Sequence, residues 1–332
     1  MAEPVLTDST AFTDGTAFTD GTAFTDDAAL TDDAALTDGT AEFSSVRGRL
    51  FGIAYRMLGT VADAEDVVQE AWVRWQTTDR SVVREPAAFL ATTTTRLAIN
   101  AATSAYARRE QYVGPWLPEP VATTEDPLLG AERSEALSLA VLVLLERLTP
   151  TERAVIVLRE AFDYPFRRIA EVLETSEANA RQLARRARVQ LAGASGAAGP
   201  STGSGTGAGS GTGEHTRLLA AFMAAAQRGD LEALEQLLSG DAVATADGGG
   251  VVNAARRPVA GGENVARFLL GISERFGQGA TYEVVEVNGL PAVLSLREGE
   301  PLALVAIDTS DGVITSVFLV RNPEKLVKFD AR

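Results

Sequence analysis

The sequence predicts a multidomain protein in which two all-α domains precede an α+β domain, and three observations support this fold class. Between residues 43 and 192, apolar residues recur at the i, i+3, i+4, i+7 spacing of amphipathic helices. Residues 193–213 consist of Gly, Ala, Ser and Thr with one Pro, a composition typical of a flexible linker between domains. In residues 214–332 the helical patterns come first, and four short apolar runs separated by Gly-containing turns follow them.

The composition excludes some functions and locations of the protein and leaves others open. The 332 residues carry a formal net charge of −15, but residues 1–42 alone hold ten acids and no Lys or Arg. The stretch Tyr164–Leu191 has the opposite bias, with six Arg and three Glu, so a nucleic-acid partner is compatible with the acidic average. No Cys is present, which excludes disulfides and thiolate chemistry. No run of 18 apolar residues and no signal-peptide pattern occurs, so we expect a cytoplasmic protein without a membrane partner.

Residues 1–42 form an acidic N-terminal segment. Residues 7–42 are six related hexapeptides, such as TDGTAF and TDDAAL, with at most one large apolar residue in each. So little apolar surface does not build a core, and the segment is expected to be disordered. Two interpretations stay open: a solvating tail, or an acidic mimic of nucleic acid that competes for the basic helix.

Residues 43–111 are expected to fold as the first helical domain. Helical patterns cover Phe43–Gly59, Val61–Gln76 and about Ala87–Arg109, and Thr60 suits the N-cap of the second helix. Opposite its wide apolar stripe, the second helix has an acidic and polar face. That face contains Asp63, Asp66, Gln69 and Glu70. It fits either a solvated surface or a surface that steers a protein partner into register.

Residues 112–130 are expected to form an extended linker. Pro118 and Pro120 hold the residues before them out of the helical conformation. Trp116 and Leu117 are large apolar residues in this otherwise exposed segment. They can pack locally or dock on another domain, and we favour docking.

Residues 131–192 are expected to form the second helical domain. A helix over Ser134–Arg147 precedes a capping box at Thr149–Glu152. Two short helices follow within Tyr164–Leu191, joined by a tight turn at which Ser176 suits an N-cap. The free face of the second helix carries Arg181, Gln182, Arg185, Arg186 and Arg188. This pattern predicts a DNA-reading helix-turn-helix, and the alternative is an Arg-rich solvated helix in an ordinary bundle.

Residues 214–332 are expected to form an α+β domain. The expected helices are Thr216–Arg228, Leu231–Leu238 and Glu263–Phe276, and the expected strands are Thr281–Val287, Ala292–Leu296, Leu302–Asp308 and Val313–Arg321. Groups for acid–base chemistry are scarce. The single His, His215, is expected to be exposed beside the linker, and Asp247 belongs to a Gly-rich loop. We therefore expect a binding or regulatory role and not an enzyme.

Several of these segments resemble a known family. DAEDVVQEAWVRW (63–75) resembles the polymerase-binding helix of bacterial sigma factors, the helix after it resembles their −10 reader, and residues 148–188 resemble their −35-binding domain. The lack of a domain between the two resembles the extracytoplasmic-function (ECF) group. YVGPWLPEP (112–120), DGGG (247–250) and NPEKL (322–326) resemble three motifs of an ECF subgroup with a C-terminal SnoaL-like domain.

The resemblance implies a function and its partners. It implies a transcription initiation factor that binds core RNA polymerase through the acidic face of residues 63–70 and promoter DNA through both helical domains. Residues 214–332 are then a cone-shaped SnoaL-like domain that tunes this activity, with no cofactor and no metal. The implied −10 contacts are Arg96, Asn100, Arg108 and Arg109. The implied regulatory docking residues are Trp116, Leu117, Pro118, Glu119, Pro120, Asp247, Gly248, Gly249, Gly250, Asn322, Pro323, Glu324, Lys325 and Leu326.

Two departures from the family pattern carry expectations of their own. AATSAYA (101–107) stands where basic residues are usual, which puts the strength of the −10 contacts in question. Val251 stands where a Lys commonly follows the glycines, so docking is expected to depend on apolar and backbone contacts and only weakly on salt. The alternative function is a helix-turn-helix regulator fused to a small-molecule-binding or cyclase/isomerase-like enzyme domain. A small ligand of the C-terminal domain stays open.

Overall fold

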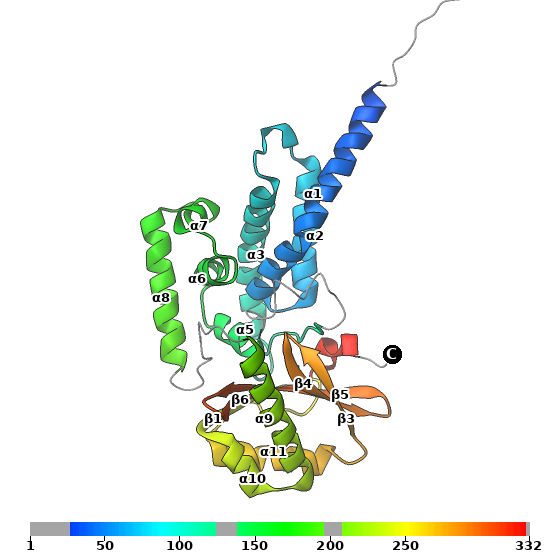
Figure 1. Ribbon diagram of the computed structural model, residues 1–332, viewed down its shortest axis with the longest axis vertical. Coiled ribbons are helices and arrows are strands. Elements are labelled where there is room, and N and C mark those ends of the chain that lie inside the picture. Colours follow the sequence, from blue (N-terminus) through cyan, green and yellow to red (C-terminus); the bar gives the residue numbers. More distant parts are fainter. Residues whose placement is uncertain (1–26, 124–137, 196–207, 330–332) are drawn as a thin grey trace, which may run out of the picture.

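The computed structural model describes residues 27–123, 138–195 and 208–329. Two helical units lie side by side above a mixed sheet, and further helices cover the far side of that sheet (Figure 1). The expected order of two all-α domains followed by an α+β domain is confirmed. Among the described residues, no helix is long and apolar enough to cross a membrane.

The first helical unit consists of α1, α2 and α3, with a short 3-10 turn between the last two. Their bounds are α1 Asp27–Leu58, α2 Val61–Thr77, η1 Arg80–Val82 and α3 Pro86–Glu110. Gly59 ends α1 at a φ of 73°, and Thr60 caps α2 by accepting a hydrogen bond from the Asp63 N–H at 3.3 Å. The apolar stripe of α2, from Val61 to the fully buried Trp75, packs against the other two helices.

Helix α1 corrects the expectation for the acidic segment. The helix begins at Asp27, so residues 27–42 are helical instead of disordered, while residues 1–26 lie outside the described part. The Ala and Leu residues of this stretch are good helix formers, and its acids suit the positive N-terminal end of a helix. Its last turns are tied to the domain, because the Trp75 Nε1–H donates to the Gly39 carbonyl at 2.9 Å.

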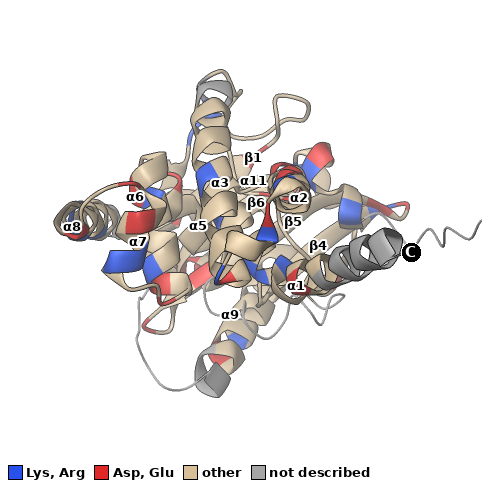
Figure 2. Ribbon diagram, turned by 90° about the horizontal axis from the view of Figure 1, so that it is seen from above, with Lys and Arg blue, Asp and Glu red and all other residues tan. Residues whose placement is uncertain are grey.

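The second helical unit contains the helix-turn-helix. Its elements are α5 Leu139–Leu145, α6 Pro150–Ile156, the π-helical turn η2 Val157–Ala161, α7 Phe166–Val172 and α8 Glu177–Ser195. The capping box at Thr149 and Glu152 is present, with Pro150 in the first turn. Helix α5 is shorter than expected, and residues 134–137 of the expected helix lie outside the described part. Seen from above, α8 lies at the outer edge, with α6 and α7 between it and α3 (Figure 2).

The two helical units share one hydrophobic core. It includes Leu50 and Ile53 of α1 together with Val155 of α6, Ile169 of α7 and Leu183 of α8. Because burying apolar surface is the main stabilising term, separating the two units would expose part of this core. The two helical units therefore pack against each other and are not independent domains joined only by a linker.

Within residues 208–329, the C-terminal domain has three α-helices and a six-stranded sheet. The helices are α9 Ala208–Arg228, α10 Leu231–Leu237 and α11 Gly262–Phe276. The strands are β1 Leu238–Asp247, β2 Val259–Ala260, β3 Thr281–Val287, β4 Leu290–Arg297, β5 Glu300–Ser310 and β6 Val313–Val320. The order in the sheet is β2-β1-β6-β5-β4-β3, with β1 parallel to β6 and the other neighbours antiparallel.

Strand β1 was not expected from the sequence. LSGDAVATAD contains small residues and a Gly, which weaken the strand signal. Its pairing with β6, from Val243↔Ser316 to Asp247↔Val320, supplies the order that its local sequence lacks. This pairing places Asp247 beside the end of β6.

The sheet is apolar on both faces. Alternate residues of β4, β5 and β6, such as Val293, Val305 and Leu319, pack with α9, α10 and α11. Their neighbours face the other way, into a second core that includes Leu294 and Val320. That second core is completed by Leu117 of the linker and by Leu139 and Ala140 of α5. Two 3-10 turns, η3 Pro323–Lys325 and η4 Val327–Phe329, add Leu326, which lies between them, and Phe329 at the end of η4.

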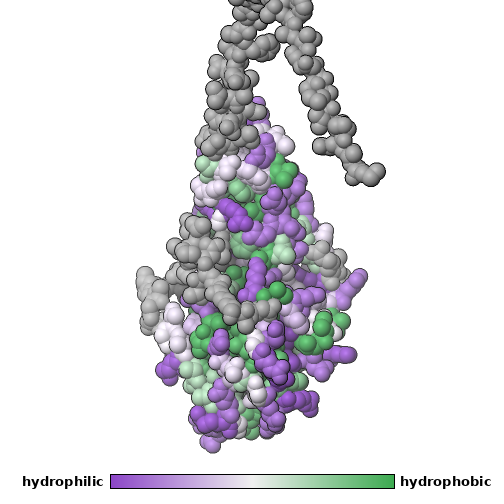
Figure 3. Space-filling model, turned by 90° about the vertical axis from the view of Figure 1, so that its right-hand side faces the viewer, coloured by the Kyte–Doolittle hydropathy of each residue, from purple (hydrophilic) through white to green (hydrophobic). Residues whose placement is uncertain are grey.

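The edge strand β3 lies at the side of the molecule. Its Val284 side chain is 73% exposed. On the described surface of that side, hydrophobic residues are interspersed with hydrophilic ones (Figure 3). One face of the sheet is therefore covered by helices and the other by the linker and α5, whereas this edge is open.

Candidate functional site

The three short sequence motifs meet around the carboxylate of Asp247. This side chain is fully buried at the end of β1. It accepts hydrogen bonds from the Tyr112 hydroxyl at 2.6 Å and from the Leu117 backbone N–H at 2.9 Å. It also accepts one from the Gly249 N–H at 3.0 Å, which fixes the Gly-rich loop. The bonds from Tyr112 and Leu117 cross from the linker to the C-terminal domain.

Lys325 neutralises this carboxylate. Its ammonium lies 2.7 Å from the Asp247 carboxylate, and it also donates to the Leu117 carbonyl. The ammonium lies 4.3 Å from the centre of the Trp116 ring, a cation–π contact. Burial lowers the pKa of Lys325, and the charge of Asp247 opposes that shift. The paired charges together bind both polar groups of the Leu117 backbone.

Asn322 joins the third motif to the linker. Its Nδ2 donates to the Tyr112 hydroxyl at 3.0 Å, and its Oδ1 accepts from the Glu324 N–H at 3.1 Å. Gly249 packs directly on this side chain at a φ of 64°, and a Cβ there would lie 2.6 Å from Asn322. The motif therefore needs Gly at this position for close approach as well as for its backbone conformation.

The linker continues along the first helical domain. The Glu119 N–H donates to the Gly59 carbonyl at 2.8 Å, and the Glu119 carboxylate accepts from the Val61 N–H at 2.8 Å. The Glu119 carbonyl accepts from the Tyr55 hydroxyl at 2.6 Å. Burial raises the pKa of Glu119, and the bond from the Val61 N–H opposes that shift. One residue thus binds the end of α1 and the start of α2.

Asn288, in the turn between β3 and β4, binds both helix α1 and the linker from the side of the sheet. Its Nδ2 donates to the Tyr55 hydroxyl at 2.9 Å, and its Oδ1 accepts from the Val121 N–H at 3.1 Å. The Asn288 N–H donates to the Val121 carbonyl at 2.9 Å, and Ala122 forms a β-bridge with Val287. The linker is therefore held between helix α1 and the sheet.

Arg109 connects α3, the linker and the second helical domain. Its guanidinium lies 3.6 Å from the centre of the Trp116 ring and donates to the Leu58 carbonyl and to Glu146. Glu146, at the end of α5, also pairs with Arg153 at 2.7 Å. Burial lowers the pKa of Arg109, and Glu146 opposes that shift. A charged network therefore links both helical domains beneath Trp116.

The other expected docking residues lie around this cluster. Leu117, Pro118, Pro120, Gly248 and Leu326 are buried, whereas Pro323, Glu324 and Gly250 are exposed. The structure adds Tyr112, Tyr55, Asn288 and Glu146, which the sequence analysis did not single out. Tyr112 opens the motif YVGPWLPEP and was within reach of sequence reasoning, but the others depend on contacts between distant segments.

The charges of this cluster correct one expectation. Docking was expected to depend on apolar and backbone contacts, because Val251 replaces a Lys. Val251 is 68% exposed, but Lys325 supplies a buried charge from a different motif. The contact is therefore partly ionic, and because the pair is buried, salt screens it little.

The acidic face of α2 is open to solvent. Asp66, Gln69 and Glu70 are exposed, and Glu70 pairs with Arg74 of the same helix at 3.0 Å. Asp63 is only half-buried and accepts a hydrogen bond from the Thr60 hydroxyl at 2.6 Å, so part of its role is to cap the helix.

The basic face of α8 is also on the surface. Arg181, Gln182, Arg185, Arg186 and Arg188 are all exposed. Arg181 pairs with Glu177, Arg186 lies 3.6 Å from Glu152, and Arg188 pairs with Glu160. In the part of the chain that the structure describes, Arg185 forms no ion pair.

Comparison with known proteins identifies the family. Residues 43–109 match Sigma-70 region 2, and residues 138–191 match Sigma-70 region 4. The ECF RNA polymerase sigma factor SigJ of Mycobacterium tuberculosis is 41% identical over 302 residues, which cover 86% of this chain and 92% of SigJ. The chain belongs to the ECF RNA polymerase sigma factors. This sigma factor therefore acts in promoter-directed transcription initiation.

A second relative and a solved structure agree with this assignment. The probable ECF RNA polymerase sigma factor SigI of Mycobacterium tuberculosis is 30% identical over 292 residues, covering 86% of this chain and 94% of SigI. The crystal structure of Mycobacterium tuberculosis SigJ matches with a TM-score of 0.69 and 36% identity, covering 87% of this chain and 98% of that chain. The match includes the C-terminal domain, so the whole architecture is that of a sigma factor with an extension.

The residues expected on −10 DNA are not all free in this sigma factor. Arg96 of α3 donates to the Val172 and Glu171 carbonyls at 2.8 and 3.0 Å, at the C-terminal end of α7. Arg109 belongs to the network described above. Asn100 is exposed, and the side chain of Arg108 lies outside the described part. Two of the four expected DNA contacts therefore hold the two helical domains together.

One residue in the C-terminal domain differs from its expectation. His215 is buried instead of exposed, with its Nε2 3.1 Å from the Pro291 carbonyl, because α9 begins before it and packs it against β4. Burial lowers its pKa. Among the described residues, no group of three or more His, Asp or Glu side chains is placed to hold a metal ion.

Proposed function

We propose that the C-terminal domain tunes initiation by holding the two helical domains of this sigma factor in a closed arrangement. The observation that carries the proposal is the Asp247 carboxylate, which binds Tyr112 and Leu117 of the linker while paired with Lys325. The apolar second face of the sheet supports it, because that face is covered by the linker and α5. Release of the linker would therefore loosen both domains at once.

The closed arrangement is incompatible with simultaneous reading of both promoter elements. Arg96 places α3 in direct contact with α7. The −10 and −35 elements lie roughly 25 base pairs apart, about 85 Å at 3.4 Å per base pair. The two domains must separate to reach both, and that separation frees Arg96 and Arg109 for −10 DNA. The recognition face, Arg181 to Arg188 on α8, is then the −35 reader.

Binding of core RNA polymerase is compatible with the closed form. Asp66, Gln69 and Glu70 of α2 are exposed on a side that the C-terminal domain does not cover. Polymerase therefore has access to its surface first, and the docked linker opposes the later separation of the helical domains. Regulation then acts on promoter engagement and not on polymerase binding.

The test is transcription in vitro with core polymerase and the full chain. The double variant Asp247→Asn/Lys325→Met removes the paired charges without leaving either one alone, and it is expected to raise promoter output. Asp241→Asn, an exposed carboxylate on the same strand, is the matched control. Removal of everything after Gly199 is expected to lower output, because it also deletes the sheet face and so exposes the apolar residues of the linker and α5 that pack on it. Equal output from all four proteins would show that the C-terminal domain does not regulate this sigma factor.

A further inference from the structure

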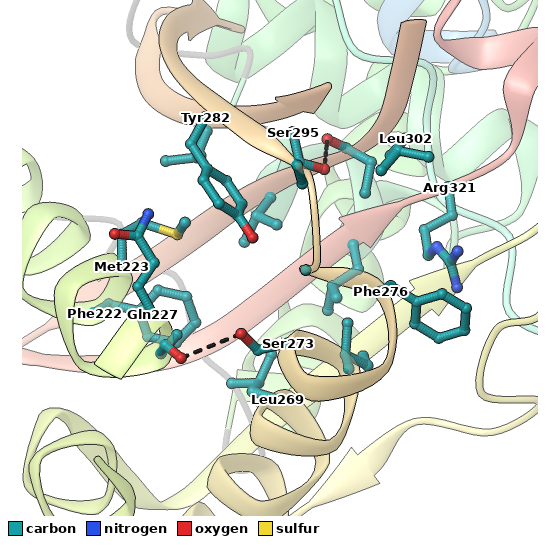
Figure 4. Close-up of a pocket in the computed structure, with 18 residues that line it drawn as sticks. Phe222, Met223, Gln227, Leu269, Ser273, Phe276, Tyr282, Ser295, Leu302 and Arg321 are labelled. Carbon is teal, nitrogen blue, oxygen red and sulfur yellow. Dashed lines mark hydrogen bonds between the residues drawn. The ribbon is translucent and has the colours of Figure 1, made fainter. Parts of the chain in front are cut away.

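A hollow opens on the face of the sheet opposite to the linker. It lies between α9, α11 and strands β3 to β6, has a volume of about 90 Å³, and is open to solvent at its mouth (Figure 4). This volume is several times the roughly 10–15 Å³ that one water molecule needs, so the hollow admits an apolar chain that extends out through the mouth. Its walls are mainly apolar, and they include Phe222, Met223, Leu269, Phe276 and Leu302.

Arg321 is the one charged residue among the described residues that line this hollow. Its guanidinium lies 4.4 Å from the centre of the Phe276 ring and donates to the Asn253 carbonyl. The neighbouring Arg297 donates to the Phe276 carbonyl at 2.7 Å. In the described part of the chain, neither arginine forms an ion pair. Burial and the charge of Arg297 lower the pKa of Arg321, as expected for a cation without an anionic neighbour.

A polar group faces Arg321 across the hollow. The Tyr282 hydroxyl points into the space from β3 (Figure 4). Within the described residues it has no hydrogen-bond partner. The two Ser hydroxyls of the walls are already used, because Ser295 donates to the Ala303 carbonyl at 3.1 Å and Ser273 to the Ala226 carbonyl at 3.2 Å. Tyr282, Arg321 and the amide of Gln227, which also lines the hollow, are thus the groups available to orient a ligand.

We propose that this hollow binds an amphipathic carboxylate, with its apolar body between α9 and α11 and its carboxylate on Arg321. The planar guanidinium matches a carboxylate in a bidentate geometry. A single guanidinium balances one negative charge, whereas a phosphate dianion needs more donors than these walls supply. Transfer of the ligand's apolar body out of water supplies most of the affinity.

The same strand connects this site to the linker. Side chains alternate along an extended backbone, so Leu319 lines the hollow and Val320 faces the linker side. The alternation continues past the strand, where Arg321 lines the hollow and Asn322 binds Tyr112. The Arg321 N–H also donates to the Asp247 carbonyl at 2.7 Å. A carboxylate that binds the Arg321 side chain and shifts its position is therefore expected to shift Asn322 and Asp247, the two residues that hold the linker.

Calorimetric titration of the full chain with three eight-carbon probes tests the site. We expect octanoate to bind at least tenfold more tightly than octan-1-ol, and octylammonium to bind more weakly than both. Arg321→Gln should bring octanoate to the level of octan-1-ol, whereas Arg217→Gln, an exposed arginine on α9, should leave it unchanged. Ala303→Phe, which fills the hollow, should abolish binding of octanoate and octan-1-ol.

Three results would overturn the proposal: no binding of any probe, equal affinity for octanoate and octan-1-ol, or a normal octanoate affinity in Arg321→Gln. Near-UV circular dichroism checks the fold of each variant, and Arg321→Lys keeps the charge and should keep a preference for octanoate. Coupling is tested by hydrogen exchange of residues 116–123, which octanoate should alter in the wild type and not in Arg321→Gln. Unchanged exchange at saturating octanoate would overturn the coupling.

Discussion

Replacing Asp247 by Asn should release the linker. The carboxylate accepts from Tyr112, Leu117, Gly249 and Lys325, and an amide offers one acceptor oxygen in place of two. The substitution therefore removes one of the two bonds to the linker and leaves the other without its charge. A hydrogen bond to a charged group contributes about 1.5–3 kcal/mol, and a neutral one about 1 kcal/mol.

Two charged bonds are replaced by one neutral bond, which gives a loss of about 2–5 kcal/mol in the free energy of docking. At about 1.4 kcal/mol per factor of ten, the docking equilibrium shifts roughly 30- to 4,000-fold toward the released linker. Backbone N–H groups of the linker report this shift directly, because those of Leu117, Glu119 and Val121 are bonded only while it is docked. Their hydrogen exchange should accelerate by the same factor.

The assay is hydrogen exchange with mass spectrometry on a peptide that covers residues 112–123. Asp241→Asn is the control, because its exposed carboxylate does not contact the linker. Asp247→Asn also leaves Lys325 buried without its partner, which lowers stability by itself. The double variant with Lys325→Met separates the two effects, since it should recover stability but not protection. Wild-type exchange rates in Asp247→Asn would refute the assignment of this carboxylate as the linker's anchor.

The remaining predictions concern DNA, polymerase and pH. Arg185→Ala should weaken promoter binding by about 1–3 kcal/mol, measured by filter binding of the polymerase complex. The control Arg217→Ala should leave promoter binding unchanged, and equal effects of the two variants would contradict the −35 assignment. Asp66→Arg with Glu70→Arg should abolish co-purification with core polymerase at an unchanged helical circular dichroism signal, and normal co-purification would contradict the polymerase-binding assignment. Burial raises the pKa of Asp308 from 3.8 to about 6, so its folded state holds a proton that the unfolded state releases, and stability from this group falls as pH rises through that window. Asp308→Asn should therefore raise the free energy of unfolding by about 1–2 kcal/mol at pH 7 and by little at pH 4, measured by urea titration; an equal gain at both pH values would point to another cause.

Much of the fold follows from local sequence signals. The N-caps Thr60 and Thr149 bond to backbone groups only a few residues away, so the starts of their helices could be predicted. The prolines of the linker restrict only their neighbours, so the extended segment could be predicted as well. The Gly-containing turns between the apolar runs likewise allowed the hairpins to be predicted. Asn288 and Asp311, which precede Gly289 and Gly312 in two of these turns, have the positive φ that such turns need.

The missed features depend on contacts between distant segments. Strand β1 has weak local preference and is ordered by β6, which lies about 70 residues further along the chain. The meeting of Tyr55 with Asn288 joins residues separated by 233 positions. One signal was available: LALVAI and SVFLV in β5 and β6 are apolar at nearly every position, which indicates strands buried on both faces.

The docked linker changes the topology of the chain as well as its packing. With residues 112–123 fixed to the sheet, the helix-turn-helix domain lies in a closed loop, joined to the C-terminal domain by residues 124–138 on one side and 196–207 on the other. Fully extended, these 15 and 12 residues reach at most about 50 and 40 Å at roughly 3.3 Å per residue. Both lengths fall short of the promoter spacing of about 85 Å. Undocking opens the loop and adds the 12 residues 112–123 to the first connection, for 27 in all and about 90 Å. Under the proposed function, the distance that the two DNA-reading domains can span therefore depends on whether Asp247 holds the linker.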